Sequence, residues 1–173
     1  MCIRDSAVFH DFFNHKELKS FVTAQPRAIE LATAAAKAAD SKKGEDVVVL
    51  DVSGPVVITD AFVLVSADNE RLVAAIVDEI EDDLRDLGAK PVRREGVREG
   101  RWALLDYGDI VVHVFRSEER DFYGLDRLWR DCPRIEVEGV EQPSNEDGED
   151  SARNARSIDE IPLAAENPDT DEF

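Results

Sequence analysis

The chain has 173 residues, a length that allows one compact domain with additional terminal segments. Hydrophobic residues make up 43% of it, enough for a core, and no apolar run approaches the roughly 18 to 20 residues that a membrane-spanning helix needs. We therefore expect a cytoplasmic protein that does not bind a membrane. The formal net charge of -18 disfavours a surface that follows nucleic-acid phosphates, so we expect no direct binding to DNA.

The first 25 residues mix aromatic and charged side chains without a sustained period. Their opening letters, MCIRDS, look like translated adaptor sequence, so residues 1–25 are interpreted as an N-terminal extension and left out of the fold prediction. Cys2 and Cys132 lie far apart, and neither has CxxC or another metal-ligand spacing. The sequence therefore predicts free thiols and neither a metal site nor a cofactor.

Residues 26–137 carry the pattern of a folded α/β domain. PRAIELATAAAKAAD opens with Pro26, which suits a first helical turn, and its apolar spacing predicts a helix that ends before Ser41. Two β-branched runs follow, at 47–54 and 58–67. Both are continuous rather than alternating, which is typical of strands covered on both faces, so we expect helices on both sides of the sheet.

The clearest helix is SADNERLVAAIVDEIEDDLRDLG at 66–88, with Ser66 or Asp68 as its cap and Gly88 as its left-handed end. After a basic loop at 89–100, RWALLDYGDIVVHVFR (101–116) predicts two strands around DYGD. A last helix at 117–131 places Phe122, Leu125 and Trp129 along one face. Residues 134–137, RIEV, predict a short edge strand.

The predicted order is α-β-β-α-β-β-α. Two tight hairpins separated by a helix indicate a mixed sheet with helices on both faces, not a doubly wound parallel sheet. Residues 138–173 contain twelve acidic and two basic side chains, which predicts a disordered acidic tail.

The hairpin at 101–116 places polar groups in apolar strands. A turn of two or four residues pairs Trp102 with His113 and Asp106 with Asp109, whereas a three-residue loop would shift every partner by one. In the first register Trp102 and His113 share one face of the sheet. Asp106 and His113 then lie too far apart for an acid–base pair. Tyr107 is predicted to project from the tip, where an exposed aromatic ring suggests a partner.

Three strand-end carboxylates are the main catalytic candidates. Asp51, Asp60 and Asp106 could hold Mg²⁺ for nucleotidyl transfer, but the spacing at 106–109 is D-x-x-D and no phosphate-cradling helix follows VSGP at 52–55. The alternative is that they form turns by accepting hydrogen bonds from nearby backbone amides. His113 is expected to have a hydrogen-bond partner.

Three stretches together resemble the Iojap family of ribosomal silencing factors, RsfS. They are LDVSG…ITDAFVLVSADNER, GRWALLDYGDIVVHVF and RDFYGLDRLW, in that order over roughly 27–132. The resemblance implies a non-enzymatic protein whose nucleotidyltransferase-like fold lacks the catalytic signature. It also implies binding to ribosomal protein fourteen of the large subunit, a block of subunit association, repression of translation under nutrient limitation, and a homodimer when free.

The resemblance also assigns residues. The family's tryptophan is Trp102, its turn is Asp106 to Asp109, and its strand histidine is His113. The final-helix pattern includes Arg120, Tyr123 and Asp126, of which Asp126 departs from the usual glutamate. The predicted partner-binding residues are Trp102, Asp106, Tyr107, Asp109, His113, Arg120 and Tyr123. A metal-dependent nucleotidyltransferase and a plain dimeric scaffold are the rival hypotheses.

Overall fold

The computed structural model describes residues 22–143, and the remainder of the predicted N-terminal extension and acidic tail lies outside these residues. The elements are α1 (Pro26–Ser41), β1 (Glu45–Asp51), β2 (Ala61–Ala67), α2 (Glu70–Asp86), β3 (Arg93–Glu95), β4 (Trp102–Asp106), β5 (Ile110–Arg116), α3 (Ser117–Tyr123) and α4 (Leu125–Leu128). The predicted order is confirmed with two additions. The basic loop contains the short strand β3, and the last helix is divided into α3 and α4.

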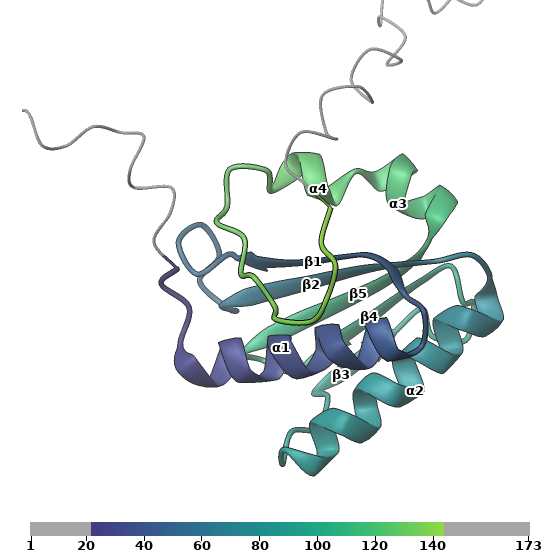
Figure 1. Cartoon of the computed structure of the whole chain (residues 1–173), viewed down its shortest axis with the longest axis horizontal. Helices are drawn as coiled ribbons and strands as arrows, with labels where there is room; N and C mark the ends of the chain where they lie inside the picture. Colours follow the sequence, from purple (N-terminus) through teal and green to yellow (C-terminus); the bar gives the residue numbers. More distant parts are fainter. Residues whose placement is uncertain (1–21, 144–173) are drawn as a thin grey trace, which may run out of the picture. The chain divides into compact units, whose positions relative to one another are not determined.

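The strands form one mixed sheet in the order β1-β2-β5-β4-β3. β2 and β5 are parallel, and the other neighbours are antiparallel. Figure 1 shows α1 and α2 on one side of the sheet and α3 and α4 on the other. The prediction of a mixed sheet with helices on both faces is therefore confirmed. The sheet is mixed because the chain crosses from one hairpin to the next through α2, which makes β2 and β5 parallel.

The face toward α1 and α2 carries the larger core. The helix α1 contributes mainly alanines, whose small side chains allow close approach to the sheet, and α2 contributes larger aliphatic groups. The buried core residues of these two helices are Ala28, Leu31, Ala32, Ala35, Ala36, Ala38, Ala39, Val73, Ile76, Val77, Ile80 and Leu84.

The helix ends follow local chemistry. Pro26 occupies the first turn of α1 as predicted. The cap of α2 is Asn69, whose Oδ1 accepts from Leu72 N–H at 2.9 Å. The prediction of Ser66 or Asp68 is wrong, because the strand β2 continues through Ala67 and carries Ser66 within it.

Residues after Pro133 run along the outer edge of β1. Asp51 N–H donates to Pro133 O, and Ile135 N–H donates to Val49 O. The predicted edge strand over 134–137 is reduced to one isolated bridge, between Leu50 and Arg134. The segment nevertheless covers an otherwise unpaired strand edge. Its packing reaches beyond the predicted boundary at 137, since Val140 is also buried in the core.

Within 22–143, no helix combines the length and the apolar character that crossing a membrane requires.

Candidate functional site

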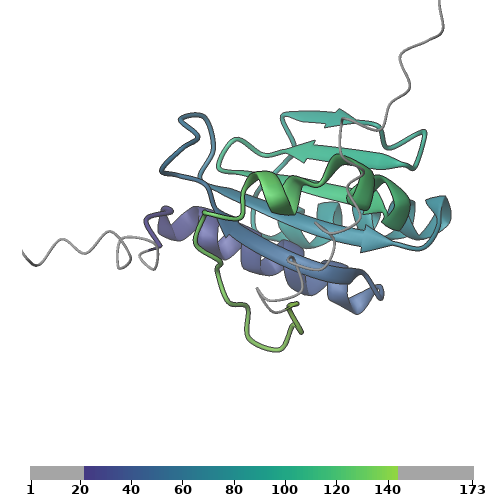
Figure 2. The same ribbon diagram turned by 90° about the horizontal axis from the view of Figure 1, so that it is seen from above.

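The face of the sheet toward α3 and α4 is smaller, more aromatic and only partly covered. Its buried centre includes Leu64 and Phe115, and Phe62, Trp102 and Trp129 pack around them with part of their surface exposed. Figure 2 shows α3 and α4 over one part of the sheet and the β4–β3 side left open by them. This open region is the candidate functional surface.

The hairpin β4–β5 closes with the two-residue turn Gly108–Asp109. Tyr107 N–H donates to Ile110 O at 2.9 Å, and this bond fixes the turn. The predicted pairing of Asp106 with Asp109 is wrong, because the prediction placed the turn one residue too early. Asp106 accepts from Gly108 N–H at 2.8 Å, so it shapes the turn as a turn-forming aspartate does.

The corrected register still joins Trp102 and His113. Trp102 lies opposite Phe115, and His113 lies opposite Leu104. The predicted Trp102–His113 pairing is wrong by two residues, but a shift of two keeps every side chain on its face. The two rings are diagonal neighbours, and the indole Nε1–H of Trp102 donates to Nδ1 of His113 at 3.1 Å.

His113 is a buried, neutral residue. It is 6% exposed, and burial lowers its pKa to about 4. Its ring lies edge-on to Phe62, with centroids 5.2 Å apart. The expectation of a hydrogen-bond partner is confirmed by Trp102, whereas the predicted contact of His113 with another molecule stays a prediction.

Arg120 is an internal anchor of α3. Its guanidinium forms two bonds with the Asp126 carboxylate, at 2.9 and 3.0 Å, and donates to Ser66 Oγ and to the carbonyl of Asp46. β1 has an irregular register between Glu45 and Val48, which includes Asp46. Arg120 is buried and fixes α3 to the sheet, and its predicted contact with a partner stays a prediction.

Tyr107 is also buried, which overturns the expectation that it projects from the hairpin tip. Its ring belongs to the core toward α1 and α2. Burial, followed by the nearby charge of Glu81, raises the pKa of Tyr107 to about 12. The tip itself is formed by Gly108 and Asp109, both exposed. The sequence could not reveal this, because the ring enters the core only in the observed register.

The strand-end carboxylates hold backbone groups at the start of α1. Asp51 accepts from the N–H groups of Thr23 and Ala24 and from Ser53, and Asp60 accepts from Gln25 N–H. Burial alone would raise the pKa of Asp51, but these hydrogen bonds outweigh it and lower the pKa. Nothing among residues 22–143 forms a cluster of three or more side chains suited to a metal. The turn-forming interpretation fits Asp106 and the bond of Asp51 to Ser53, whereas Asp60 and the other bonds of Asp51 hold backbone groups far away in the sequence.

A set of exposed apolar side chains lies beside Trp102. Tyr123 contacts the indole with ring centroids 4.6 Å apart, and Phe122 contacts Tyr123 edge-on at 5.1 Å. Phe122 is 80% exposed and Tyr123 is 50% exposed, whereas Trp102 is half-buried. We call Trp102, Phe122 and Tyr123 the aromatic surface. Leu128, 71% exposed on α4, adds another apolar group to the outer layer.

Helical periodicity predicted one face for Phe122, Leu125 and Trp129, and that prediction is wrong for Phe122. Gly124 has the left-handed φ of 59°, which ends α3 and starts α4 on a new path. Leu125 and Trp129 therefore pack on the sheet while Phe122 points outward. The glycine in FYGL was the available signal for this break.

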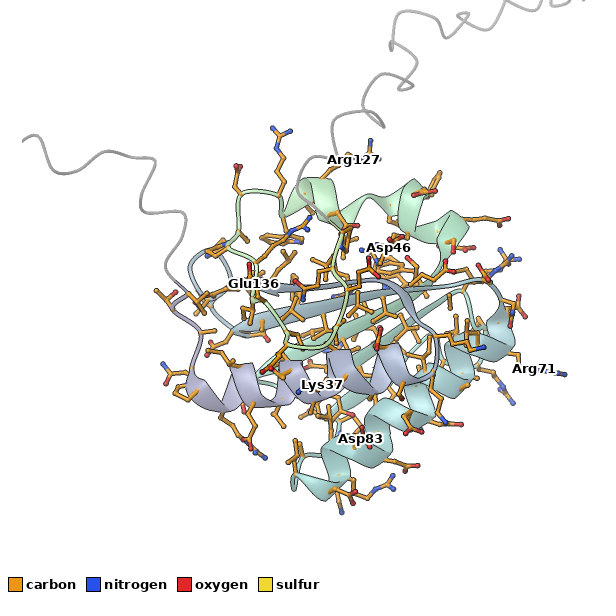
Figure 3. The ribbon with its side chains drawn as sticks, in the orientation of Figure 1. Lys37, Asp46, Arg71, Asp83, Arg127 and Glu136 are labelled. Carbon is orange, nitrogen blue, oxygen red and sulfur yellow. The ribbon has the colours of Figure 1, made fainter. Side chains whose placement is uncertain are left out.

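Basic side chains border the α3–α4 layer and α2. Arg127 lies on the outer side of α4, and Arg71 points away from the sheet at the start of α2 (Figure 3). Both are exposed. Arg127 donates to the carbonyl of Asp121, at 3.3 Å.

Comparison with known proteins gives a consistent set of relatives. The family described as "ribosomal silencing factor during starvation" matches residues 25–161. The ribosomal silencing factor RsfS of Halalkalibacterium halodurans is 42% identical over 111 residues, which cover 64% of this chain and 95% of that protein. The chloroplastic protein Iojap of Zea mays is 34% identical over 112 residues, covering 63% of this chain and 47% of Iojap.

Two solved structures are also similar. A Chromobacterium violaceum protein superposes with a TM-score of 0.57 at 31% identity, covering 66% of this chain and 88% of that one. A Bacillus halodurans protein superposes with a TM-score of 0.56 at 39% identity, covering 62% of this chain and 98% of that one.

Proposed function

Since the chain belongs to the RsfS family of ribosomal silencing factors, we propose that it binds the large ribosomal subunit through ribosomal protein fourteen of that subunit. In this proposal the bound chain blocks association with the small subunit and represses translation when nutrients are limiting. The protein acts by occupying a surface, in the cytoplasm, and carries out no reaction.

The observation that carries this proposal is the aromatic surface. Trp102, Phe122 and Tyr123 are linked by ring contacts and retain exposed area on the open side of the sheet. Tryptophan and tyrosine concentrate binding energy at protein interfaces, because a large rigid ring is buried at a small entropic cost. The surface stands on strands and a helix that Arg120 anchors, so it is preorganised for docking.

Charge supports a protein partner rather than RNA as the main contact. The chain carries a net charge of -18, which repels phosphate groups. Ribosomal RNA is therefore an unfavourable partner for the chain as a whole, whereas an apolar or basic protein patch is a favourable partner for the aromatic surface.

The free protein is proposed to be a homodimer. An exposed aromatic patch is a ready surface for a second copy of the chain as well as for the ribosome. If both partners use the aromatic surface, dimerisation and ribosome binding exclude each other. A complex that contains two copies per large subunit would contradict this exclusion.

Gradient sedimentation with separated ribosomal subunits tests the proposal. The chain should sediment with large subunits, not with small subunits, and should reduce the yield of joined ribosomes. Failure to bind large subunits at physiological salt would overturn the proposed function. Mg²⁺-dependent nucleotide binding that Asp106→Asn abolishes would instead revive the nucleotidyltransferase hypothesis.

A matched pair of variants locates the binding surface. Leu128→Ala should weaken binding to large subunits if the α4 side belongs to the interface. Val92→Ala removes an aliphatic side chain of similar exposure, 79% against 71%, from the segment before β3, and a smaller effect there would place the interface on the α3–α4 side of the open region. Equal effects of the two variants would count against a localised surface.

Trp102→Ala should weaken binding by about 2 kcal/mol or more, the size expected of an interface hot spot. This variant also removes a ring that packs on Phe115 and leaves Nδ1 of His113 without its donor. Circular dichroism and thermal unfolding must therefore accompany the binding measurement. Loss of the fold would assign Trp102 to the core instead of the interface.

A further inference from the structure

We propose that His113 is the positioning residue of Trp102: it accepts the indole N–H and thereby fixes the orientation in which the aromatic surface meets its partner. The role in docking rests on the proposed function, whereas the hydrogen bond can be measured in the free chain.

The geometry defines which atoms take part. The indole Nε1–H can only donate, so Nδ1 of His113, 3.1 Å away, must be the unprotonated nitrogen. The neutral ring then carries its proton on Nε2. Nε2 is buried and has no hydrogen-bond partner among residues 22–143, so no second donor is directed at Nε2 that would force the proton onto Nδ1.

The bond supplies a direction that the other contacts of Trp102 lack. The indole stacks on Phe115 at 4.9 Å and lies tilted against Tyr123 at 4.6 Å. Apolar contacts of this kind tolerate rotation of the ring, whereas a hydrogen bond weakens steeply as its angle departs from linear. Without the acceptor, the indole keeps its packing but loses the constraint that fixes its orientation beside Tyr123.

His113 is itself held firmly enough to serve as a reference point. Phe62 lies edge-on to its ring, and Phe115 stacks parallel to it at 5.9 Å with an interplanar angle of 12°. The ring also sits on β5 between β2 and β4, the strands that flank it in the sheet. The support for Trp102 is therefore a central strand rather than a loop.

The acceptor is stable to changes in pH near neutrality. The charged and titratable groups around this face include Asp106 on β4, Cys132 after α4, and the Arg120–Asp126 pair and Tyr123 of the α3–α4 layer, while β2 contributes the apolar Phe62 and Leu64. Burial alone accounts for the lowered pKa of His113, about 4. Protonation below that pH would convert Nδ1 into a donor and break the bond.

The indole signal of the free chain tests the hydrogen bond. Trp129→Phe leaves Trp102 as the only tryptophan, and its indole N–H is then followed by ¹⁵N NMR. His113→Phe keeps a ring but removes the acceptor, while His113→Asn keeps an oxygen the same number of bonds from the backbone as Nδ1. We expect indole exchange with solvent to accelerate about tenfold in His113→Phe and to change about twofold or less in His113→Asn.

A pH titration of the chain that retains His113 separates the hydrogen bond from packing, because packing alone would not change the indole resonance with pH. The Trp102 indole resonance should titrate with a midpoint near pH 4, and this transition should be absent from both His113 variants. Unchanged indole exchange in His113→Phe, or no indole transition in the chain that retains His113, would overturn the inference. This titration tests the hydrogen bond even if one His113 variant folds poorly, because it uses the chain that retains His113.

Binding to large subunits tests the consequence for docking. His113→Phe should lower the affinity about three- to tenfold, and His113→Asn should restore most of it. A freed indole with unchanged affinity would refute the positioning role. Failure of the proposed function is distinguishable, because then no chain binds large subunits while the indole results still follow the expected pattern.

Discussion

The two faces of the sheet are built from different chemistry. The face toward α1 and α2 is closed and mainly aliphatic, and the polar groups buried there include the Tyr107 hydroxyl and the Asp51 carboxylate at the start of α1. The face toward α3 and α4 is aromatic, contains the buried polar groups His113 and Arg120, and is open along β4. Non-directional burial stabilises the first face, and directional bonds arrange the second.

This difference separates stability from recognition. A closed aliphatic face stabilises the fold but offers nothing for a partner to contact. The open face gives up some burial and keeps the aromatic surface available, with Arg120 and His113 fixing the parts around it. Substitutions on the closed face should therefore change mainly the free energy of unfolding. Substitutions in the aromatic surface should change mainly the affinity for large subunits.

The largest expected effect comes from neighbours on β4 that point to opposite faces. Leu105→Ala should lower the free energy of unfolding by about 2–5 kcal/mol, because Leu105 is fully buried toward α1 and α2. Leu104→Ala should cost less than half as much, since Leu104 is only partly buried on the open face. Urea denaturation of both variants measures this, and equal losses would show that the open face is packed as tightly as the closed one.

Acidification should destabilise the fold through the open face. His113 has a folded-state pKa of about 4, below the 6.5 of an unperturbed histidine, so the unfolded chain binds more protons between these values. Stability is thus full above pH 6.5 and falls by about 3 kcal/mol as pH drops through 4. Urea denaturation midpoints across this pH range should show the loss of stability. In His113→Phe the midpoints should depend much less on pH over the same range.

A second acid transition is expected at the start of α1. The pKa of Asp51 is lowered in the folded state, so its contribution is present above the unfolded value of 3.8 and is lost as pH falls below it. Asp51→Asn should remove this lower transition and leave the one from His113 in place.

Removing the anchor of α3 should have an intermediate effect. Arg120→Ala leaves the Asp126 carboxylate without its partner, and because Asp126 is about one third exposed we expect a loss of about 2–3 kcal/mol rather than that of a fully buried pair. Arg127→Ala, an exposed arginine on α4, is the control and should change stability by about 0.5 kcal/mol or less. Thermal unfolding distinguishes Arg120→Ala from Arg127→Ala. If both variants lowered the unfolding temperature by the same small amount, Arg120 would not anchor α3.

The smallest effect on stability, and a large one on binding, is expected at the aromatic surface. Tyr123→Ala should change the free energy of unfolding by about 1 kcal/mol or less, because half of its surface is already exposed. Affinity for large subunits should fall about tenfold or more. If stability fell as far as in Leu105→Ala while binding did not change, the open face would be core rather than interface.

Much of this architecture could be read from the sequence. Continuous β-branched runs indicated strands covered on both faces, the four-residue apolar repeat located α2, and period-two alternation placed Trp102 and His113 on one face. Local sequence suffices here, because helix and strand periodicities are properties of short segments. The motifs that resemble RsfS lie in these same segments, and the family is confirmed.

Only the tertiary structure decided what surrounds each polar or aromatic side chain. Tyr107 enters the core because the turn forms one residue later than predicted, and Arg120 is buried because Ser66 and Asp46 meet it from strands far away in the sequence. Asp51 stabilises the start of α1 for the same reason. Burial and hydrogen bonding depend on distant neighbours, and periodicity gives the direction of a side chain but not its partner.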